Sequence, residues 1–88
     1  MDNIITVRNE NGTKDFIKLL EFSSTKTNKD YVLYVENTDN EDAKLEIMCS
    51  IIKKESNGIK LLDLESDDDF IECNNAMKIY LENLKTNL

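Results

Sequence analysis

Two kinds of residue in this sequence could carry chemistry: a pair of cysteines and several clustered carboxylates. Cys49 and Cys73 stand 24 residues apart without a C-x-x-C spacing, so neither a zinc site nor a thiol redox motif is indicated. A disulfide between them is an alternative, but nothing in the sequence points to an oxidising compartment. We therefore predict two buried free thiols that pack as small hydrophobic side chains.

The carboxylates gather in two segments. The members are Asp67, Asp68, Asp69 and Glu72 in one, and Asp39, Glu41 and Asp42 in the other. Oxygen ligands of this kind bind hard cations, but the spacing does not match a calcium loop and the glycine of such a loop is missing. We interpret the first segment as negative charge at a helix N-terminus and the second as a solvated loop. No metal ion and no other cofactor is predicted.

Other catalytic signatures are missing. The chain has no histidine, the commonest general base and the usual partner of a nucleophile. Its two glycines, Gly12 and Gly58, form no phosphate-binding loop. The three tyrosines could stack on bases, but without interleaved basic residues they are better read as core or half-buried sheet residues. We predict that the protein is not an enzyme and that it has no small-molecule ligand.

The charge balance is acidic. Asp and Glu number 18 against 11 Lys and Arg, which gives a net charge of −7. Such a field repels phosphate backbones, whose binding depends on cationic side chains, so no direct nucleic-acid binding is predicted. An acidic surface can attract basic proteins or imitate nucleic acid, although solubility is the simplest reading of it.

The 88 residues are predicted to form one small acidic domain, residues 1–88. The N-terminus has no basic segment followed by a long apolar stretch, so no secretory signal is expected. The longest apolar run is 31–35, far short of the roughly 20 residues of a membrane helix. We expect a cytoplasmic protein that does not associate with membranes.

The apolar pattern predicts strands followed by one helix. Asn11-Gly12 and Asn57-Gly58 indicate hairpin turns, because Asn and Gly tolerate the positive φ that such turns require. The run from Ala43 alternates in its first half, which favours a strand, although its length leaves a helix as an alternative. The expected strands cover residues 4–8, 14–22, 29–36, 43–54 and 59–65.

The periodicity changes after the last strand. Ser66 is expected to cap a helix, and the three aspartates that follow it favour the positive end of the helix dipole. Apolar residues then recur with the spacing of one helical face over about 18 residues. These residues are Phe70, Cys73, Met77, Tyr80, Leu81 and Leu84. The predicted fold is therefore α+β: a strongly curled, five-stranded antiparallel meander with one C-terminal helix.

The order of several short motifs carries a family resemblance. The motifs are I-I-T-V-x-x-E-N-G, F-I-K-L-L-E-F, D-Y-V-L-Y-V, N-G-I-K-L-L-D-L-E and D-D-D-F-I-E. In this order, over residues 3 to 85, the chain resembles the YrzB-like bacterial family of unknown function. Members of that family are small, acidic and cytoplasmic, although this chain is less acidic and richer in Asn and Lys. The resemblance implies no activity, cofactor or catalytic residue.

Several expected strands carry apolar residues on both faces, which is unusual for a sheet with one solvated face. One helix about 10 Å across cannot cover five strands that span roughly 20 Å or more. Either the sheet curls on itself, or a second chain, such as a homodimer partner, covers the rest.

We predict a protein-interaction or adaptor module; the alternatives are a nucleic-acid mimic that inhibits a basic nucleic-acid-binding protein and, least favoured, a small metal-dependent hydrolase. The candidate interaction surface comprises Ile17, Leu19, Tyr34, Met48, Leu62 and Leu64.

Overall fold

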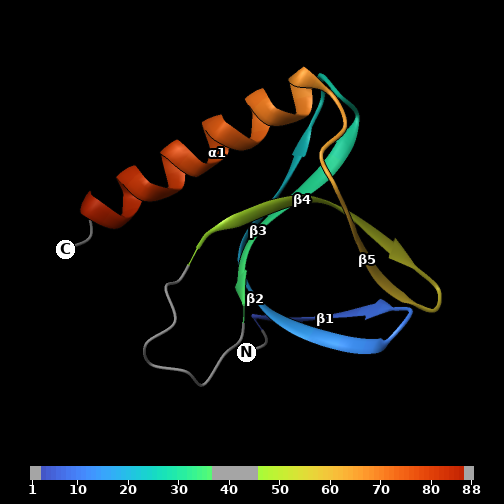
Figure 1. The fold of residues 1–88 in the computed structure, drawn as a ribbon. Coiled ribbons are helices and arrows are strands. Elements are labelled where there is room, and N and C mark those ends of the chain that lie inside the picture. The colour runs from blue at the N-terminus through green and yellow to red at the C-terminus, as the bar shows by residue number, and fades with distance from the viewer. Residues whose placement is uncertain (1–2, 37–45, 87–88) are drawn as a thin grey trace.

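A computed structural model describes residues 3–36 and 46–86 of the chain. Five strands are followed by one helix: β1 (Ile4–Asn9), β2 (Gly12–Ser24), β3 (Lys29–Glu36), β4 (Met48–Glu55), β5 (Gly58–Leu62) and α1 (Asp67–Thr86) (Figure 1). Consecutive strands pair antiparallel, which confirms the predicted α+β meander with a C-terminal helix. Of the strand predicted at 43–54, residues 43–45 lie outside the described residues, and the run forms a strand from Met48 onward. The helix alternative is wrong for this described part.

The sheet closes into a barrel. The first and last strands meet in parallel through Val7 and Ile59, so the order β1-β2-β3-β4-β5 returns on itself. Strand β2 makes this closure possible, because it pairs with β1 up to Ile17 and with β3 from Phe16 onward. Its register shifts between Lys18 and Leu20, and a bulge of this kind bends a strand and increases its twist. Curling by the sheet itself, one of the two expected solutions, is therefore what the chain adopts.

Both predicted hairpins form, with a different turn geometry from the one expected. In each, the residue before the two-residue turn pairs with the glycine after it: Asn9 with Gly12, and Glu55 with Gly58. The positive φ angles fall on the glycines, at 121° for Gly12 and 139° for Gly58. Asn11 is not among the non-glycine residues with positive φ. Glycine is thus required just after each turn, because other side chains rarely adopt a positive φ of this size.

The apolar side chains form two clusters on opposite faces of the sheet. All five strands contribute to the interior cluster, as expected of the inside of a barrel. Its members are Ile5, Val7, Val32, Tyr34 and Ile52, packed with Phe16, Met48, Ile59 and Leu61. The outer cluster lies under the start of α1 and comprises Tyr31, Ile51 and Cys73, packed with Phe22, Cys49, Leu62 and Leu64. Residues 31–35 of β3 are buried throughout because the strand is covered on both faces.

The exposed apolar side chains lie mostly on the helix, whereas the candidate interaction surface is predicted on the strands and the segment after them. Among the described residues, the large hydrophobic side chains that are exposed lie on α1, with Ile4 of β1 as the exception on the strands. The barrel interior absorbs one apolar face of the sheet, and the start of α1 covers part of the other. The predicted curling of the sheet thus extends to full closure.

Candidate interaction surface

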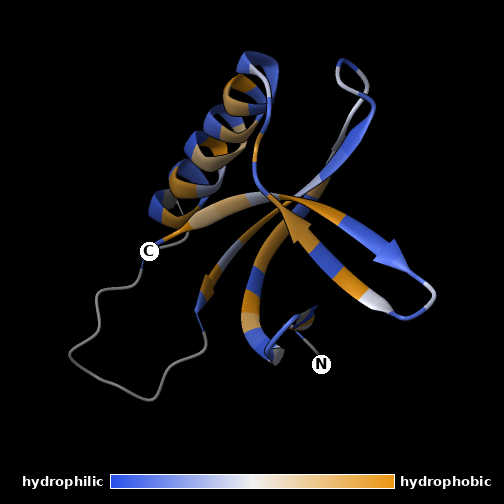
Figure 2. Ribbon diagram, turned by 45° about the vertical axis from the view of Figure 1, so that its right-hand side comes forward, coloured by the Kyte–Doolittle hydropathy of each residue, from blue (hydrophilic) through white to orange (hydrophobic). Residues whose placement is uncertain are grey.

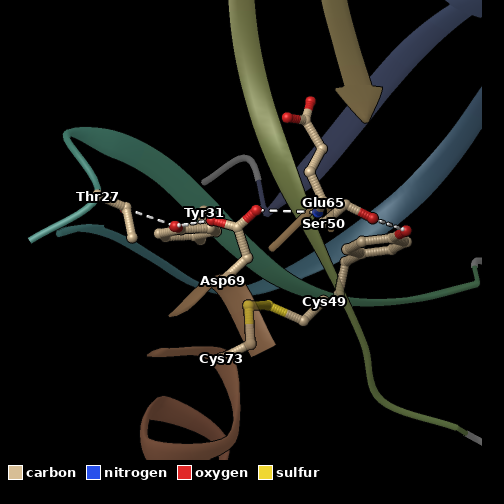
Figure 3. The surroundings of a disulfide bond; sticks show 8 residues. Thr27, Tyr31, Cys49, Ser50, Glu65, Asp69 and Cys73 are labelled. Atoms are coloured by element: carbon tan, nitrogen blue, oxygen red, sulfur yellow. Dashed lines mark hydrogen bonds between the residues drawn. A yellow bond between two sulfur atoms is a disulfide. The ribbon is translucent and has the colours of Figure 1, made fainter. Parts of the chain in front are cut away.

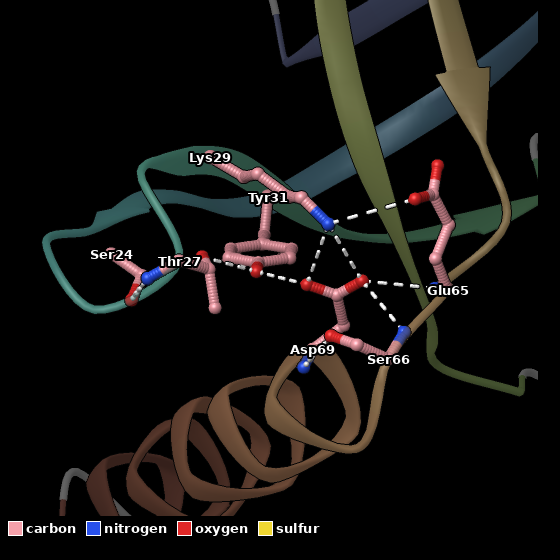
Figure 4. Close-up of polar contacts among 7 residues, drawn as sticks. All are labelled: Ser24, Thr27, Lys29, Tyr31, Glu65, Ser66 and Asp69. Carbon is pink, nitrogen blue, oxygen red and sulfur yellow. Dashed lines mark hydrogen bonds and ion pairs between the residues drawn. The ribbon is translucent and has the colours of Figure 1, made fainter.

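A buried carboxylate fixes the start of α1. Asp69 is fully buried and accepts a hydrogen bond of 2.6 Å from the Tyr31 hydroxyl. The Lys29 ammonium lies 3.1 and 3.3 Å from its two oxygens, and the backbone N–H groups of Glu65 and Ser66 donate to Oδ2 at 2.9 and 3.1 Å (Figure 4). These donors come from β3 and from the connection after β5, and Asp69 itself belongs to α1, so one side chain joins three segments.

The local sequence explains how this carboxylate comes to point inward. The Ser66 hydroxyl accepts from the Asp69 N–H at 3.2 Å, while the Ser66 N–H donates to the Asp69 carboxylate. This reciprocal arrangement resembles a capping box, with aspartate in the place of the usual glutamate. The helix start predicted at Ser66 is confirmed. The predicted fifth strand was three residues too long, because Glu65 turns its N–H toward Asp69 instead of a neighbouring strand.

The electrostatics of this group make it an anchor for the helix and unsuited to acid–base catalysis. The hydrogen bond from Tyr31, opposed by burial and reinforced by the backbone N–H groups and Lys29, holds the pKa of Asp69 well below its ordinary value. Burial and the bond to Asp69 raise the pKa of Tyr31. The bond to Asp69 likewise raises the pKa of Lys29 against the opposing effect of burial. Near neutral pH, each group thus keeps its protonation state, and the charge pattern is fixed.

Two further polar contacts attach α1 to the turn between β2 and β3. The Ser24 hydroxyl donates to Glu72 at 2.7 Å, and it also accepts from the N–H groups of Lys26 and Thr27 within its own turn. Lys26 reaches Asp68 at 3.4 Å in an exposed ion pair, a type that adds little stability. All these links lie in the first two turns of α1.

A disulfide joins the helix to the barrel. Cys49 on β4 and Cys73 on α1 are bonded, with Cα atoms 6.3 Å apart (Figure 3), within the usual range for a disulfide. The prediction of two free thiols is therefore wrong. It failed because pairing depends on two elements 24 residues apart in sequence meeting in space, and no local pattern in either segment encodes that. Cys73 follows Asp69 by one helical turn, so the covalent and polar anchors lie next to each other.

Both beside these anchors and farther along the helix, most of the apolar side chains of α1 are not covered. Phe70, Leu81 and Leu84 are between 41% and 51% exposed, and Met77 between them is half-buried. At 3.6 residues per turn these four side chains fall within about 60° of one another on the helix. We call them the apolar stripe. Figure 2 shows apolar residues recurring along the whole of α1, from the anchored end to the C-terminal end.

The predicted helical face is thus divided. Cys73 is buried and Tyr80 is half-buried on the side facing the barrel, while the stripe lies to one side of them. Ile71 and Ile79 are also exposed, at other positions around the helix. The period of this face is correctly predicted from the sequence, but periodicity alone does not show which of its side chains are covered.

The six residues predicted as an interaction surface lie in three places. Tyr34 and Met48 belong to the interior cluster, and the Tyr34 hydroxyl is hydrogen-bonded to Ser50 at 2.6 Å. Leu62 and Leu64 pack in the outer cluster. Ile17 and Leu19 are half-buried on β2, with Leu19 at the bulge. The structure does not bring these six side chains together on one face.

Three further observations concern the chemistry considered from the sequence. Within the described ranges, no group of three or more Cys, Asp or Glu side chains is placed to hold a metal ion. The acidic segment containing Asp39, Glu41 and Asp42 lies outside those ranges. Among the residues that the structure describes, no helix, the 20-residue α1 included, is both long enough and apolar enough to cross a membrane.

Comparison with known proteins adds no relative. No family model, no curated protein and no solved structure matches this chain.

Proposed function

We propose that this chain is a non-enzymatic protein-interaction module in which a closed barrel holds one helix for contact with another protein. The observation that supports the proposal is the contrast between the two ends of α1. Its first turns are attached by a buried carboxylate and a disulfide, whereas Leu81 and Leu84, farther along the helix, are exposed. Apolar side chains gathered on a rigid element are typical of interaction sites.

The polar features of the molecule support the same proposal. Asp69, whose pKa is lowered the most among the carboxylates of the described residues, is fully buried and surrounded by protein donors, so it offers no free oxygen to a substrate. Its charge state is held constant near neutral pH, which suits an anchor. We also propose that the chain is related to the YrzB-like family, which it resembles. That resemblance implies no enzymatic activity.

Site-specific photo-crosslinking in the cells that make the protein tests this function. A photoreactive residue replaces Leu81 in the apolar stripe, and a control chain carries it in place of Lys53, an exposed residue of β4. We expect covalent protein adducts from position 81 and none from position 53. Equal crosslinking from both positions, or none from either, would contradict a contact surface on α1.

A further inference from the structure

We propose that the partner of the apolar stripe is a second copy of this chain, bound through an antiparallel pair of α1 helices. This inference rests on the proposed function and names the partner of the same surface. A symmetric dimer requires one patch to be complementary to itself after a two-fold rotation. The charges and apolar residues of α1 meet that condition, as the following distances along the helix show.

The first requirement concerns charge. Asp67 at the start of α1 and Lys85 in its last turn are both exposed. They are 18 residues apart, which is five turns of 3.6 residues, so they lie on the same edge of the helix about 27 Å from each other. Neither makes an ion pair with any other residue in the described ranges. The helix therefore presents an unpaired negative charge at one end of this edge and an unpaired positive charge at the other.

The second requirement concerns the centre of the patch. The midpoint between Asp67 and Lys85 is residue 76, and the apolar stripe from Phe70 to Leu84 is centred on residue 77. A two-fold axis at this point places Asp67 of each protomer beside Lys85 of the other. The same axis places Phe70 opposite Leu84 of the second copy, with Met77 near the axis. An unrelated partner would give no reason for the charges and the stripe to share one centre.

The geometry around the stripe leaves room for a second helix. The centre of the stripe lies about 60° around the helix from the direction of Cys73 and Tyr80, of which Cys73 packs in the outer cluster. The edge that carries Asp67 and Lys85 lies still farther from the barrel. In Figure 1, α1 runs outward from the top of the barrel toward the C-terminal end, and barrel strands do not flank it on both sides.

The expected dimer is weak. Two helices that pair along about 30 Å bury an area at the low end of specific interfaces, and each protomer carries a net charge of −7 that opposes association. We therefore expect a dissociation constant in the micromolar range, about 10 to 100 µM. At about 0.15 M salt, charges farther apart than roughly 8 Å are largely screened, so the general repulsion is reduced while the close Asp67–Lys85 contacts remain.

Sedimentation equilibrium with a charge-swapped pair tests the proposal. Asp67→Lys places like charges at both ends of the homodimer, and so does Lys85→Asp, so we expect each variant alone to dimerise about tenfold more weakly than the wild type. In an equimolar mixture of the two variants, both contacts become Lys–Asp pairs again, and we expect a heterodimer of wild-type affinity. Asp63→Lys and Lys53→Asp, which make the same charge changes at exposed positions outside α1, serve as controls and should leave dimerisation within about twofold of the wild type.

The mixture also guards against damage to the fold, because two misfolded variants would not restore each other. A wild-type chain that stays monomeric from about 5 µM to about 500 µM overturns the proposal. So does a dimer that ignores the charge swaps, or one that the mixture fails to restore. If the chain is monomeric but position 81 still crosslinks to another protein, the interaction function stands and only the identity of its partner is wrong.

Discussion

The barrel buries most of its apolar side chains, whereas the helix leaves most of its own exposed. In the barrel, Val32 and Leu33 are neighbours on β3 that face opposite sides of the sheet, and both are fully buried. On α1, Cys73 is the one hydrophobic side chain that is fully enclosed, while Phe70, Leu81 and others remain at the surface. The strands therefore bury apolar side chains on both faces, one of them under the start of α1, and the helix carries apolar side chains that its attachment does not cover.

A matched pair of isoleucines gives the largest difference. Ile52 is 4% exposed in the interior cluster, and Ile79 on α1 is 58% exposed. We expect Ile52→Ala to lower the free energy of unfolding by about 3 kcal/mol, because it removes buried apolar atoms and leaves a cavity. Ile79→Ala should change it by less than about 0.5 kcal/mol. Urea unfolding followed by circular dichroism measures both, and similar losses would mean that α1 packs as tightly as the barrel.

Removal of the disulfide is expected to have the next largest effect. Its loop of 24 residues lowers the entropy of the unfolded chain by an amount worth about 3 kcal/mol at 25 °C, and real disulfides often contribute less. The double variant Cys49→Ala/Cys73→Ala should lose about 2 to 3 kcal/mol. Addition of a reductant should destabilise the wild type by a similar amount and leave the double variant unchanged. A wild type that is insensitive to reductant would show that the two sulfurs are not bonded in solution.

Asp69 and Asp68 are adjacent aspartates with different surroundings. Asp69→Asn removes the charge that Tyr31, Lys29 and two backbone N–H groups share, leaving buried donors poorly matched. We expect a fall in Tm of roughly 10 °C. Asp68→Asn removes only an exposed ion pair and should shift Tm by about 2 °C or less. Differential scanning calorimetry measures the Tm of both variants. Equal shifts would show that Asp69 does not anchor the helix.

The same anchor predicts a dependence on pH. Because the pKa of Asp69 is lower in the folded state than in the unfolded chain, its stabilising contribution is complete above the unfolded value of about 3.9 and is lost as pH falls through the folded value. The difference in Tm between the wild type and Asp69→Asn should therefore be constant from about pH 5 to pH 8 and shrink below about pH 4. A difference that stays constant down to pH 2 would contradict the depressed pKa.

Features that depend on neighbouring residues could be predicted from the sequence, and features that depend on residues far apart in the chain could not. The apolar run at 31–35, the Asn-Gly pairs and Ser66 act over a few residues, so the strands, the hairpins and the helix start were all found from the sequence. Barrel closure depends on Val7 meeting Ile59, and the disulfide depends on β4 meeting α1. Contacts at such separations leave no local pattern. The spacing of Asp69 from Ser66 is a local signal that distinguishes it from its two acidic neighbours, but its contacts with Tyr31 and Lys29 of β3 leave no such signal.

The candidate site was missed for a related reason. From the sequence, uncovered apolar side chains are expected on the sheet, because one helix is narrower than five strands side by side. Because the sheet closes, the barrel interior buries one face of it. The helix is about 30 Å long and extends past the short segment that is anchored, so its apolar side chains remain exposed there. The periodicity of α1 was visible in the sequence, but whether a periodic face is buried depends on where the helix lies.

The smallest effect on stability is expected where the effect on association is largest. Leu81→Ser in the apolar stripe should change the free energy of unfolding by less than about 0.5 kcal/mol, because this side chain is already 41% exposed. Loss of its apolar area from a helix pair should nevertheless raise the dissociation constant of the dimer about tenfold or more. Thermal unfolding at low concentration and sedimentation at high concentration measure the two quantities separately. If Leu81→Ser destabilises the monomer as much as Ile52→Ala does, the stripe belongs to the core, and the contrast between barrel and helix is wrong.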